Sequence, residues 1–259
     1  MARVSLASVL SSLGLGVCLV AFLPLLSPGL APAAPAARPA PRVQLMVVGK
    51  SRLLYPAHEV PALSTTVSVG RRRCGVASAT PLAALAAGRR RGAPPFRLRD
   101  YGSCSRRPDD SGQLFVTQIG RDRNRGAAGW VYKVDRRLGT TGAADTSGAF
   151  GTGRRLRSGQ RILWFYCGNA SSCQRTLEAT PSSRQVTSGA TVAVTVRGYD
   201  DQGGAKRIAA ATVRLGSARA LTGSDRVARL AAPTRPDRYG IAATAPGLVP
   251  SFSEAVRVR

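Results

Sequence analysis

The chain has 259 residues, of which 38 are Lys or Arg and 13 are Asp or Glu, so its formal net charge is +25. Hydrophobic residues make up 44% of the sequence, enough to bury a core in one or two domains, which excludes a wholly disordered or fibrous chain. The single histidine, His58, argues against mechanisms that use two histidines and against most zinc sites, and we expect neither a metal nor a cofactor.

The first 36 residues have the three parts of a secretory signal peptide. A short positive start precedes an apolar stretch at 13–26, and a small-residue A-x-A sequence ends at Ala36, where we expect cleavage. An Ala/Pro-rich linker follows at 37–41. An uncleaved membrane anchor and a lipoprotein attached at Cys18 remain as alternatives. No later segment has the length and hydropathy of a transmembrane helix.

Four cysteines remain after signal removal, namely Cys74, Cys104, Cys167 and Cys173. An even number in an oxidising compartment favours two disulfides, for which three pairings are possible. Cys167 and Cys173 flank a short loop, so their pairing is the local solution, and Cys74 would then pair with Cys104. A zinc site is the competing use of four thiols, although the usual C-x-x-C spacing is absent.

The first module, 42–177, combines several short strands with one helix. Apolar runs and alternation predict strands at 43–48, 65–69, 96–98, 114–119, 130–134 and 162–167. Thr80 as N-cap, Pro81 in the first turn and a terminal Gly88 predict a short helix that packs on a sheet. This pattern is typical of an α+β fold that is mostly β. His58 falls in a polar connector, where we expect a surface role.

Two aromatic segments of this module resemble the signature of the transcobalamin-like C-terminal domain family. The matching residues are Gly129–Asp135, Gly142-Ala143 and Leu156–Tyr166, with a helix opening at Thr80–Leu85. The resemblance implies a compact β-grasp-like domain. In vertebrate carriers such a domain forms one half of a cobalamin site, whose other half is a large helical barrel. This chain has no room for that barrel, so a cobalamin-type ligand stays an alternative.

The same segments supply the candidate ligand-binding residues, Trp130, Tyr132, Trp164 and Tyr166. Side chains two apart share a face of a strand, so each pair points to one side. If the strands are neighbours, the four rings can form a platform for a sugar or another flat ligand. The alternative is that they belong to the core, because both faces of the strand at 162–167 carry apolar residues.

The second module, 181–259, predicts an all-β sandwich. Short strands are expected at 191–196, 210–215, 227–230, 239–245 and 252–258, separated by Gly- and Pro-containing turns. Gly189–Val196 and Ala211–Gly216 resemble strands of bacterial Ig-like domains, which implies a spacer or adhesion module.

The basic residues are almost all arginine, and some gather in the runs Arg71–Arg73, Arg89–Arg91 and Arg154-Arg155, which we expect in loops. Arginine binds carboxylate and phosphate in bidentate fashion, so attraction to polyanions is one interpretation, and a solvated surface that maintains solubility is the other. No motif for sequence-specific nucleic-acid binding accompanies these runs. The acid pairs Asp109-Asp110 and Asp200-Asp201 lie beside turn-forming residues, and we expect them to stabilise turns.

The sequence therefore predicts an exported, monomeric, two-domain binding protein of a bacterial cell envelope or its surroundings, and not an enzyme. Its transcobalamin-like module would bind a small ligand, a glycan or a surface polymer, and its Ig-like module would present it. The alternatives are an electrostatic binder of anionic envelope polymers, a cobalamin-type ligand binder and a hydrolase.

Overall fold

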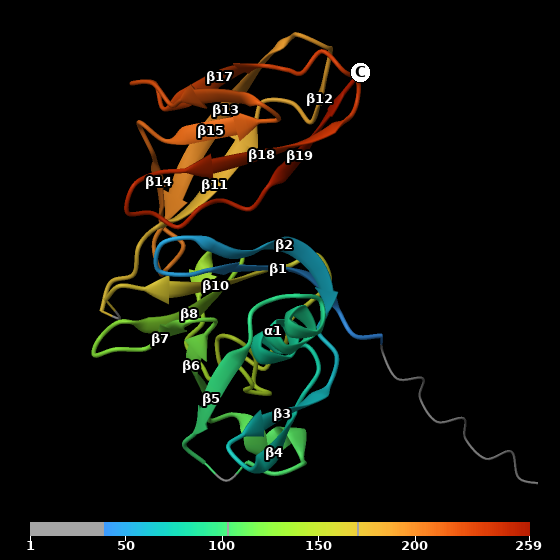
Figure 1. Ribbon diagram of the computed structural model, residues 1–259, viewed down its shortest axis with the longest axis vertical. Coiled ribbons are helices and arrows are strands. Elements are labelled where there is room, and N and C mark those ends of the chain that lie inside the picture. Colours follow the sequence, from blue (N-terminus) through green and yellow to red (C-terminus); the bar gives the residue numbers. More distant parts are fainter. Residues whose placement is uncertain (1–38, 103, 170) are drawn as a thin grey trace, which may run out of the picture. The chain divides into compact units, whose positions relative to one another are not determined.

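The computed structural model describes residues 39–102, 104–169 and 171–259 (Figure 1). The predicted signal peptide and the first residues of the linker lie outside the described residues, whereas Pro39–Arg259 forms one compact unit. Across these residues the chain is mostly β, with a single α-helix and one short 3-10 helix. No helix in the described part is both long and apolar enough to cross a membrane.

A five-stranded sheet in the order β2-β1-β10-β8-β9 organises the first part of the chain. Its strands are β1 (Arg42–Val48), β2 (Leu53–Pro61), β8 (Gly129–Val134), β9 (Arg137–Leu138) and β10 (Arg161–Cys167). β1 runs parallel to β10, and the other pairs are antiparallel. His58 lies within β2 opposite Leu45, and not in a connector as the sequence predicted. β2 lies at the edge of the sheet, and an edge strand tolerates both alternating polar residues and a proline such as Pro56.

One face of this sheet packs against α1 (Pro81–Arg90). The predicted N-cap is present, because the Thr80 side chain accepts a hydrogen bond of 3.2 Å from the backbone N–H of Ala83. The sequence predicted that the helix would end at Gly88, but it continues to Arg90. A Cβ at Gly88 would overlap the Leu45 side chain of β1, so this glycine permits close helix–sheet packing.

Two smaller sheets complete the first part. β3 (Thr65–Val69) pairs with β4 (Arg72–Val76), and β5 (Phe96–Asp100) pairs with β6 (Leu114–Ile119), which also pairs with β7 (Asp122–Arg123). Arg72 and Arg73 lie in β4 and not in a loop, because their strand partners are the predicted β3 residues Val69 and Ser68.

The second part consists of two further sheets around one core. The first contains β11 (Thr176–Pro181), β13 (Thr191–Tyr199), β14 (Ala205–Arg207) and β17 (Val227–Ala231). The second has the order β12-β19-β18-β15-β16, with β12 (Gln185–Val186), β15 (Thr212–Leu215), β16 (Ala218–Leu221), β18 (Arg238–Thr244) and β19 (Glu254–Val258). Alternate residues point inward, as Val192, Val194 and Val196 of β13 do.

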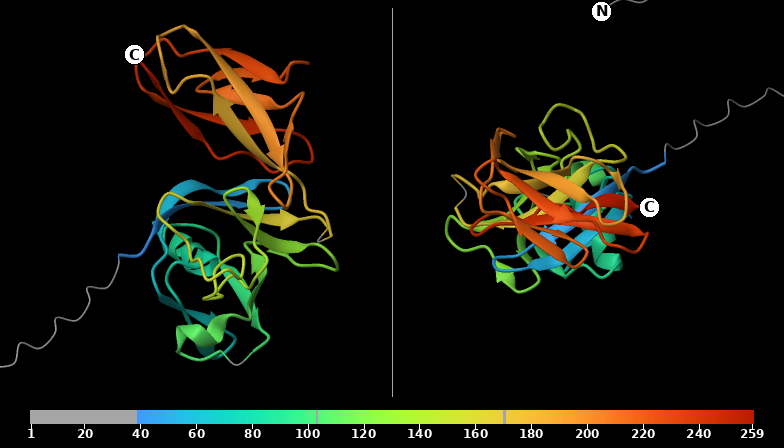
Figure 2. Two further views of the ribbon diagram at one scale, coloured as in Figure 1. Left: turned by 180° about the vertical axis from the view of Figure 1, so that it is seen from behind. Right: turned by 90° about the horizontal axis from the view of Figure 1, so that it is seen from above.

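A third apolar cluster contains residues of both parts. Figure 2 shows the backbone of the two parts from two further sides. β10 contributes to two clusters, because Ile162, Trp164 and Tyr166 lie in the first core, whereas Leu163 and Phe165 lie in the third. Val249 and Phe252, which precede β19, join the third cluster. Both faces of β10 are therefore buried, as its continuous apolar sequence predicted.

Candidate functional site: an arginine-lined groove along β19

The four predicted ligand-binding rings come together, but in the core. Trp164 lies opposite Tyr132, and Tyr166 lies opposite Trp130, across the β8–β10 pair. The ring centroids are 5.3 Å apart in the first pair and 5.8 Å in the second. None of the four residues is more than 6% exposed. The rings therefore do not form the open platform that the period-two pattern suggested.

The polar atoms of three of these rings are hydrogen-bonded, whereas the buried Trp164 indole N–H has no hydrogen-bond partner among the described residues. The Tyr132 hydroxyl donates to the carbonyl of Thr141 at 2.9 Å, and the Trp130 indole N–H donates to the carbonyl of Asp122 at 2.7 Å. The Tyr166 hydroxyl donates to the carbonyl of Arg123 at 2.9 Å. Asp122 and Arg123 belong to β7, and Thr141 lies in the loop after β9, so these hydrogen bonds are made within the protein.

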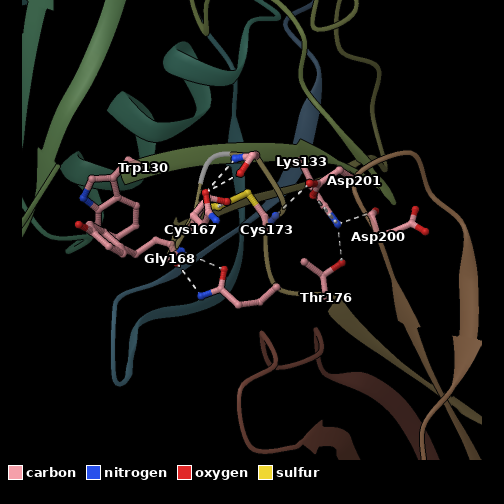
Figure 3. Close-up of a disulfide and its surroundings, with 12 residues drawn as sticks. Trp130, Lys133, Cys167, Gly168, Cys173, Thr176, Asp200 and Asp201 are labelled. Carbon is pink, nitrogen blue, oxygen red and sulfur yellow. Dashed lines mark hydrogen bonds and ion pairs between the residues drawn. A yellow bond between two sulfur atoms is a disulfide. The ribbon is translucent and has the colours of Figure 1, made fainter. Parts of the chain in front are cut away.

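Both disulfides have the predicted pairing. Cys74 of β4 is bonded to Cys104, and Cys167 at the end of β10 is bonded to Cys173 (Figure 3). In the second loop the Asn169 side chain accepts hydrogen bonds from the N–H and the hydroxyl of Ser171. Asn169 therefore stabilises this part of the loop as asparagine commonly stabilises a turn, through hydrogen bonds from its side chain to a residue two positions later.

Close to the second disulfide, the structure contains a buried lysine that the sequence did not single out. Lys133 of β8 is 0% exposed, and its Nζ donates to the carbonyls of Tyr199 at 3.0 Å and Asp200 at 2.8 Å (Figure 3). It also donates to Thr176 Oγ1 at 3.3 Å, and it lies 3.8 Å from Asp201 Oδ1. Burial lowers the pKa of Lys133 to about 8, although the neighbouring aspartates oppose this change.

Of the two aspartates beside this lysine, Asp200 stabilises its own turn, as predicted, whereas Asp201 contacts the loop closed by the second disulfide. Asp200 Oδ1 accepts hydrogen bonds from the N–H groups of Gly204 at 2.7 Å and Gln202 at 3.1 Å. Asp201 Oδ2 accepts from the N–H of Cys173 at 3.1 Å. Within the described ranges, no group of three or more His, Cys, Asp or Glu side chains is arranged to hold a metal ion.

A second junction between the two parts is an ion-pair network around Glu254, the first residue of β19. This carboxylate is mostly buried and forms ion pairs with Arg161 of β10 and, at 3.4 Å, with Arg184. The Arg161 guanidinium also lies 5.4 Å from the ring centroid of Phe252. One carboxylate therefore pairs with two arginines that line a groove.

The groove has a volume of about 860 Å³ and follows the outer face of β19. Ser253, Ala255, Arg257 and Arg259 alternate along that face, and Gln44 and Arg161 line the groove from the first part of the chain. The remaining lining residues are Arg184, Gln185, Pro236, Asp237, Arg238, Glu254 and Val258. Five of the thirteen lining residues are arginines, and two are acids.

Two of the arginines face each other directly. Arg238 of β18 is the strand partner of Arg257 of β19, and both are exposed. Like charges directly opposite each other destabilise a sheet. No ion pair within the described part of the chain involves Arg238, Arg257 or Arg259. These guanidinium groups are available to bind carboxylate or phosphate oxygens through pairs of N–H donors.

Sequence reasoning missed this groove because the register of β18 against β19 cannot be read from either strand alone. One signal was available: Arg257 and Arg259 are two apart in the closing strand, so they share a face.

A comparison with known proteins found no matching family model, no matching curated protein and no matching solved structure.

Proposed function

We propose that this chain is an exported, non-catalytic binding protein for an anionic polymer, whose carboxylate or phosphate groups occupy the groove along β19. The observation that carries this proposal is the direct opposition of Arg238 and Arg257 in a groove that already holds Arg184 and Arg259. An anionic group placed between the two guanidinium groups removes their repulsion and accepts hydrogen bonds from both.

The balance of charge across the chain supports this choice of ligand. Eight basic residues take part in ion pairs within the described residues, which contain all of the 38 Lys and Arg of the sequence except Arg3 and Arg38. The large unpaired surplus attracts polyanions over a long range, whereas the groove gives the attraction a defined place.

The remaining features fit an extracytoplasmic binder. Two disulfides join the four cysteines of the described chain, and such bonds persist in oxidising compartments. The resemblance to a transcobalamin-like module followed by an Ig-like module favours a binding unit on a spacer. The burial of Trp130 and Trp164 removes the main support for a small ligand in the first module. We therefore prefer an anionic polymer to a small molecule as the ligand.

The test compares R238Q/R257Q with the charge-matched control R71Q/R73Q. Both arginines of the control are exposed, and they lie just before and within β4, in a different sheet. Polygalacturonate and inorganic polyphosphate serve as carboxylate and phosphate probes. We expect the groove variant to bind both polymers at least about tenfold more weakly. The slope of log K against log salt should also become shallower, by the contribution of about two neutralised charges.

The control should lose far less affinity, because it removes the same charge from outside the groove. An equal loss in the two variants would mean that the polymer binds to the general basic surface and not to the groove. No loss in either variant would overturn the proposal altogether.

A further inference from the structure

Among the Phe, Tyr and Trp residues of the described ranges, only two are exposed, and they are neighbours. Tyr101 is 59% exposed and Phe115 is 45% exposed, and their ring centroids are 6.1 Å apart. The other Phe, Tyr and Trp residues in these ranges are buried or half-buried. Two large exposed rings side by side favour a binding surface over chance, because single exposed apolar residues are common but contiguous patches are not.

Arginines lie on the same side of the β5–β6 pair as these rings. Arg97 and Arg99 alternate with inward-facing residues of β5, and both are exposed. Arg99 is the strand partner of Phe115, and its guanidinium carbon lies 4.7 Å from the ring centroid of Tyr101. This distance is typical of a cation–π contact. We call Arg97, Arg99, Tyr101 and Phe115 the aromatic–arginine face.

The backbone under Tyr101 is held by a buried carboxylate. Asp100 accepts hydrogen bonds from the N–H groups of Gly102 at 2.9 Å and Cys104 at 3.1 Å, and it forms an ion pair of 2.8 Å with Arg72. Burial alone would raise the pKa of Asp100, but these N–H groups and the Arg72 charge outweigh it and hold the pKa below its ordinary value. Tyr101 therefore projects from a fixed turn, which suits a preorganised binding surface.

We infer that the aromatic–arginine face is a second binding site, and that its ligand is an acidic glycan segment with uronate-type carboxylates. Sugar rings present C–H faces that pack on Tyr101 and Phe115, whereas Arg97 and Arg99 provide the donors for the carboxylates. This inference deepens the proposed function, because it narrows the anionic polymer to one that contains sugar rings. It rests on observations separate from the groove.

The test uses Y101A/F115A, which removes both rings without a change in charge. We expect roughly tenfold weaker binding of polygalacturonate, an unchanged salt slope, and unchanged binding of inorganic polyphosphate, which has no sugar rings. The conservative variant Y101F keeps the ring and should bind like the wild type. Since both side chains are exposed, the thermal midpoint should not fall in either variant.

A second variant reports binding at this face directly. In Y101W the new indole should be exposed, whereas the native Trp130 and Trp164 are buried, so its fluorescence can be followed separately. Trigalacturonate should shift or quench this emission, and R97Q/R99Q in the same background should abolish the change.

The outcomes separate the two sites. If R238Q/R257Q weakens the binding of both polymers but Y101A/F115A weakens neither, the groove stands and the aromatic–arginine face is overturned. If Y101A/F115A weakens polyphosphate as much as polygalacturonate, the rings do not recognise sugar. If Y101W responds to single-stranded nucleic acid but not to trigalacturonate, the ligand class is wrong.

Discussion

Lys133 occupies a position where its charge is expensive. Its ammonium group has no exposure to solvent, and only backbone carbonyls, the Thr176 hydroxyl and the Asp201 carboxylate compensate for the lost hydration. Removal of this side chain would leave the carbonyls of Tyr199 and Asp200 without a donor that they now use. The lysine thus ties β8 to the turn after β13.

We predict that K133M lowers the free energy of unfolding at pH 7 by about 3 kcal/mol, because a buried carboxylate and two carbonyls lose their partner. The expected pH dependence is more specific. The pKa of Lys133 falls from 10.5 to about 8 on folding, so between these pH values the unfolded chain holds a proton that the folded chain has released. The stability of the wild type relative to K133M should therefore rise with pH across this window, by up to about 1.4 kcal/mol per pH unit.

Chemical denaturation between pH 7 and the upper end of this window measures the difference. The control is K206M, because Lys206 is exposed in β14 and its loss should change neither stability nor the pH profile. A relative stability of wild type and K133M that stays flat, or falls, as pH rises would contradict a lowered pKa for Lys133.

At the same scale, the direction of the candidate rings could be predicted, but their exposure could not. Period-two alternation placed Trp130 with Tyr132 and Trp164 with Tyr166, and the pairing of β8 with β10 confirms that the four are neighbours. Exposure depends on β7, which provides the carbonyls of Asp122 and Arg123, and on the loop that provides the carbonyl of Thr141. Nothing in the sequences of β8 and β10 specifies where these segments lie.

Among the elements, β8 and β10 provide the clearest contrast between a core and a site. Every side chain of β10 after Arg161 is buried, and Trp130 of β8 contacts Tyr166 edge to face. Such rings contribute through packing, and their loss leaves a cavity that the surrounding sheet cannot fill.

We therefore predict that W130A lowers the free energy of unfolding by about 3–5 kcal/mol. Polymer binding, measured well below the melting transition, should not change, because Trp130 lies in neither the groove nor the aromatic–arginine face. Y101A is the comparison, since loss of an exposed ring should change stability by less than about 0.5 kcal/mol. Loss of binding by W130A without loss of stability would restore the open-platform hypothesis.

Strands with apolar alternation were predictable, including the edge strand β3, whereas polar edge strands were not. β3 and β6 match the predicted ranges, and β1, β8 and β10 differ from them by one residue, because apolar alternation marks them. β2, β4, β14 and β16 were missed. Edge strands keep polar and charged side chains to avoid further pairing, and this removes the signal that reveals inner strands.

For the molecule as a whole, the mostly β architecture with one short helix followed from the sequence, but the junction between its two parts did not. β11 was not predicted as a strand, although it pairs with β13 along its whole length. The contacts of Lys133 and Glu254 connect residues 43 to 93 positions apart, and no local pattern indicates partners at such a distance.

The proposal that the chain folds in an oxidising compartment concerns the whole molecule, and the two disulfides provide a test of this proposal. The Cys74–Cys104 bond closes a loop with a sequence separation of 30, and the Cys167–Cys173 bond closes one of 6. Loss of chain entropy in the unfolded state predicts stabilisation of about 4 and about 2 kcal/mol, respectively. We expect C74A/C104A to lower the free energy of unfolding more than C167A/C173A. Denaturation under non-reducing conditions measures this order.

The decisive measurement is a thiol titration of the protein recovered from outside the cell, unfolded so that every sulfhydryl can react. We expect no reactive thiol from Cys74, Cys104, Cys167 or Cys173, and four after reduction. Four free thiols before reduction would contradict the proposed oxidising location. They would also mean that no covalent bond links β4 to Cys104, the cysteine that follows the turn presenting Tyr101. Exported protein with both bonds intact is therefore the material in which the two binding sites should be compared.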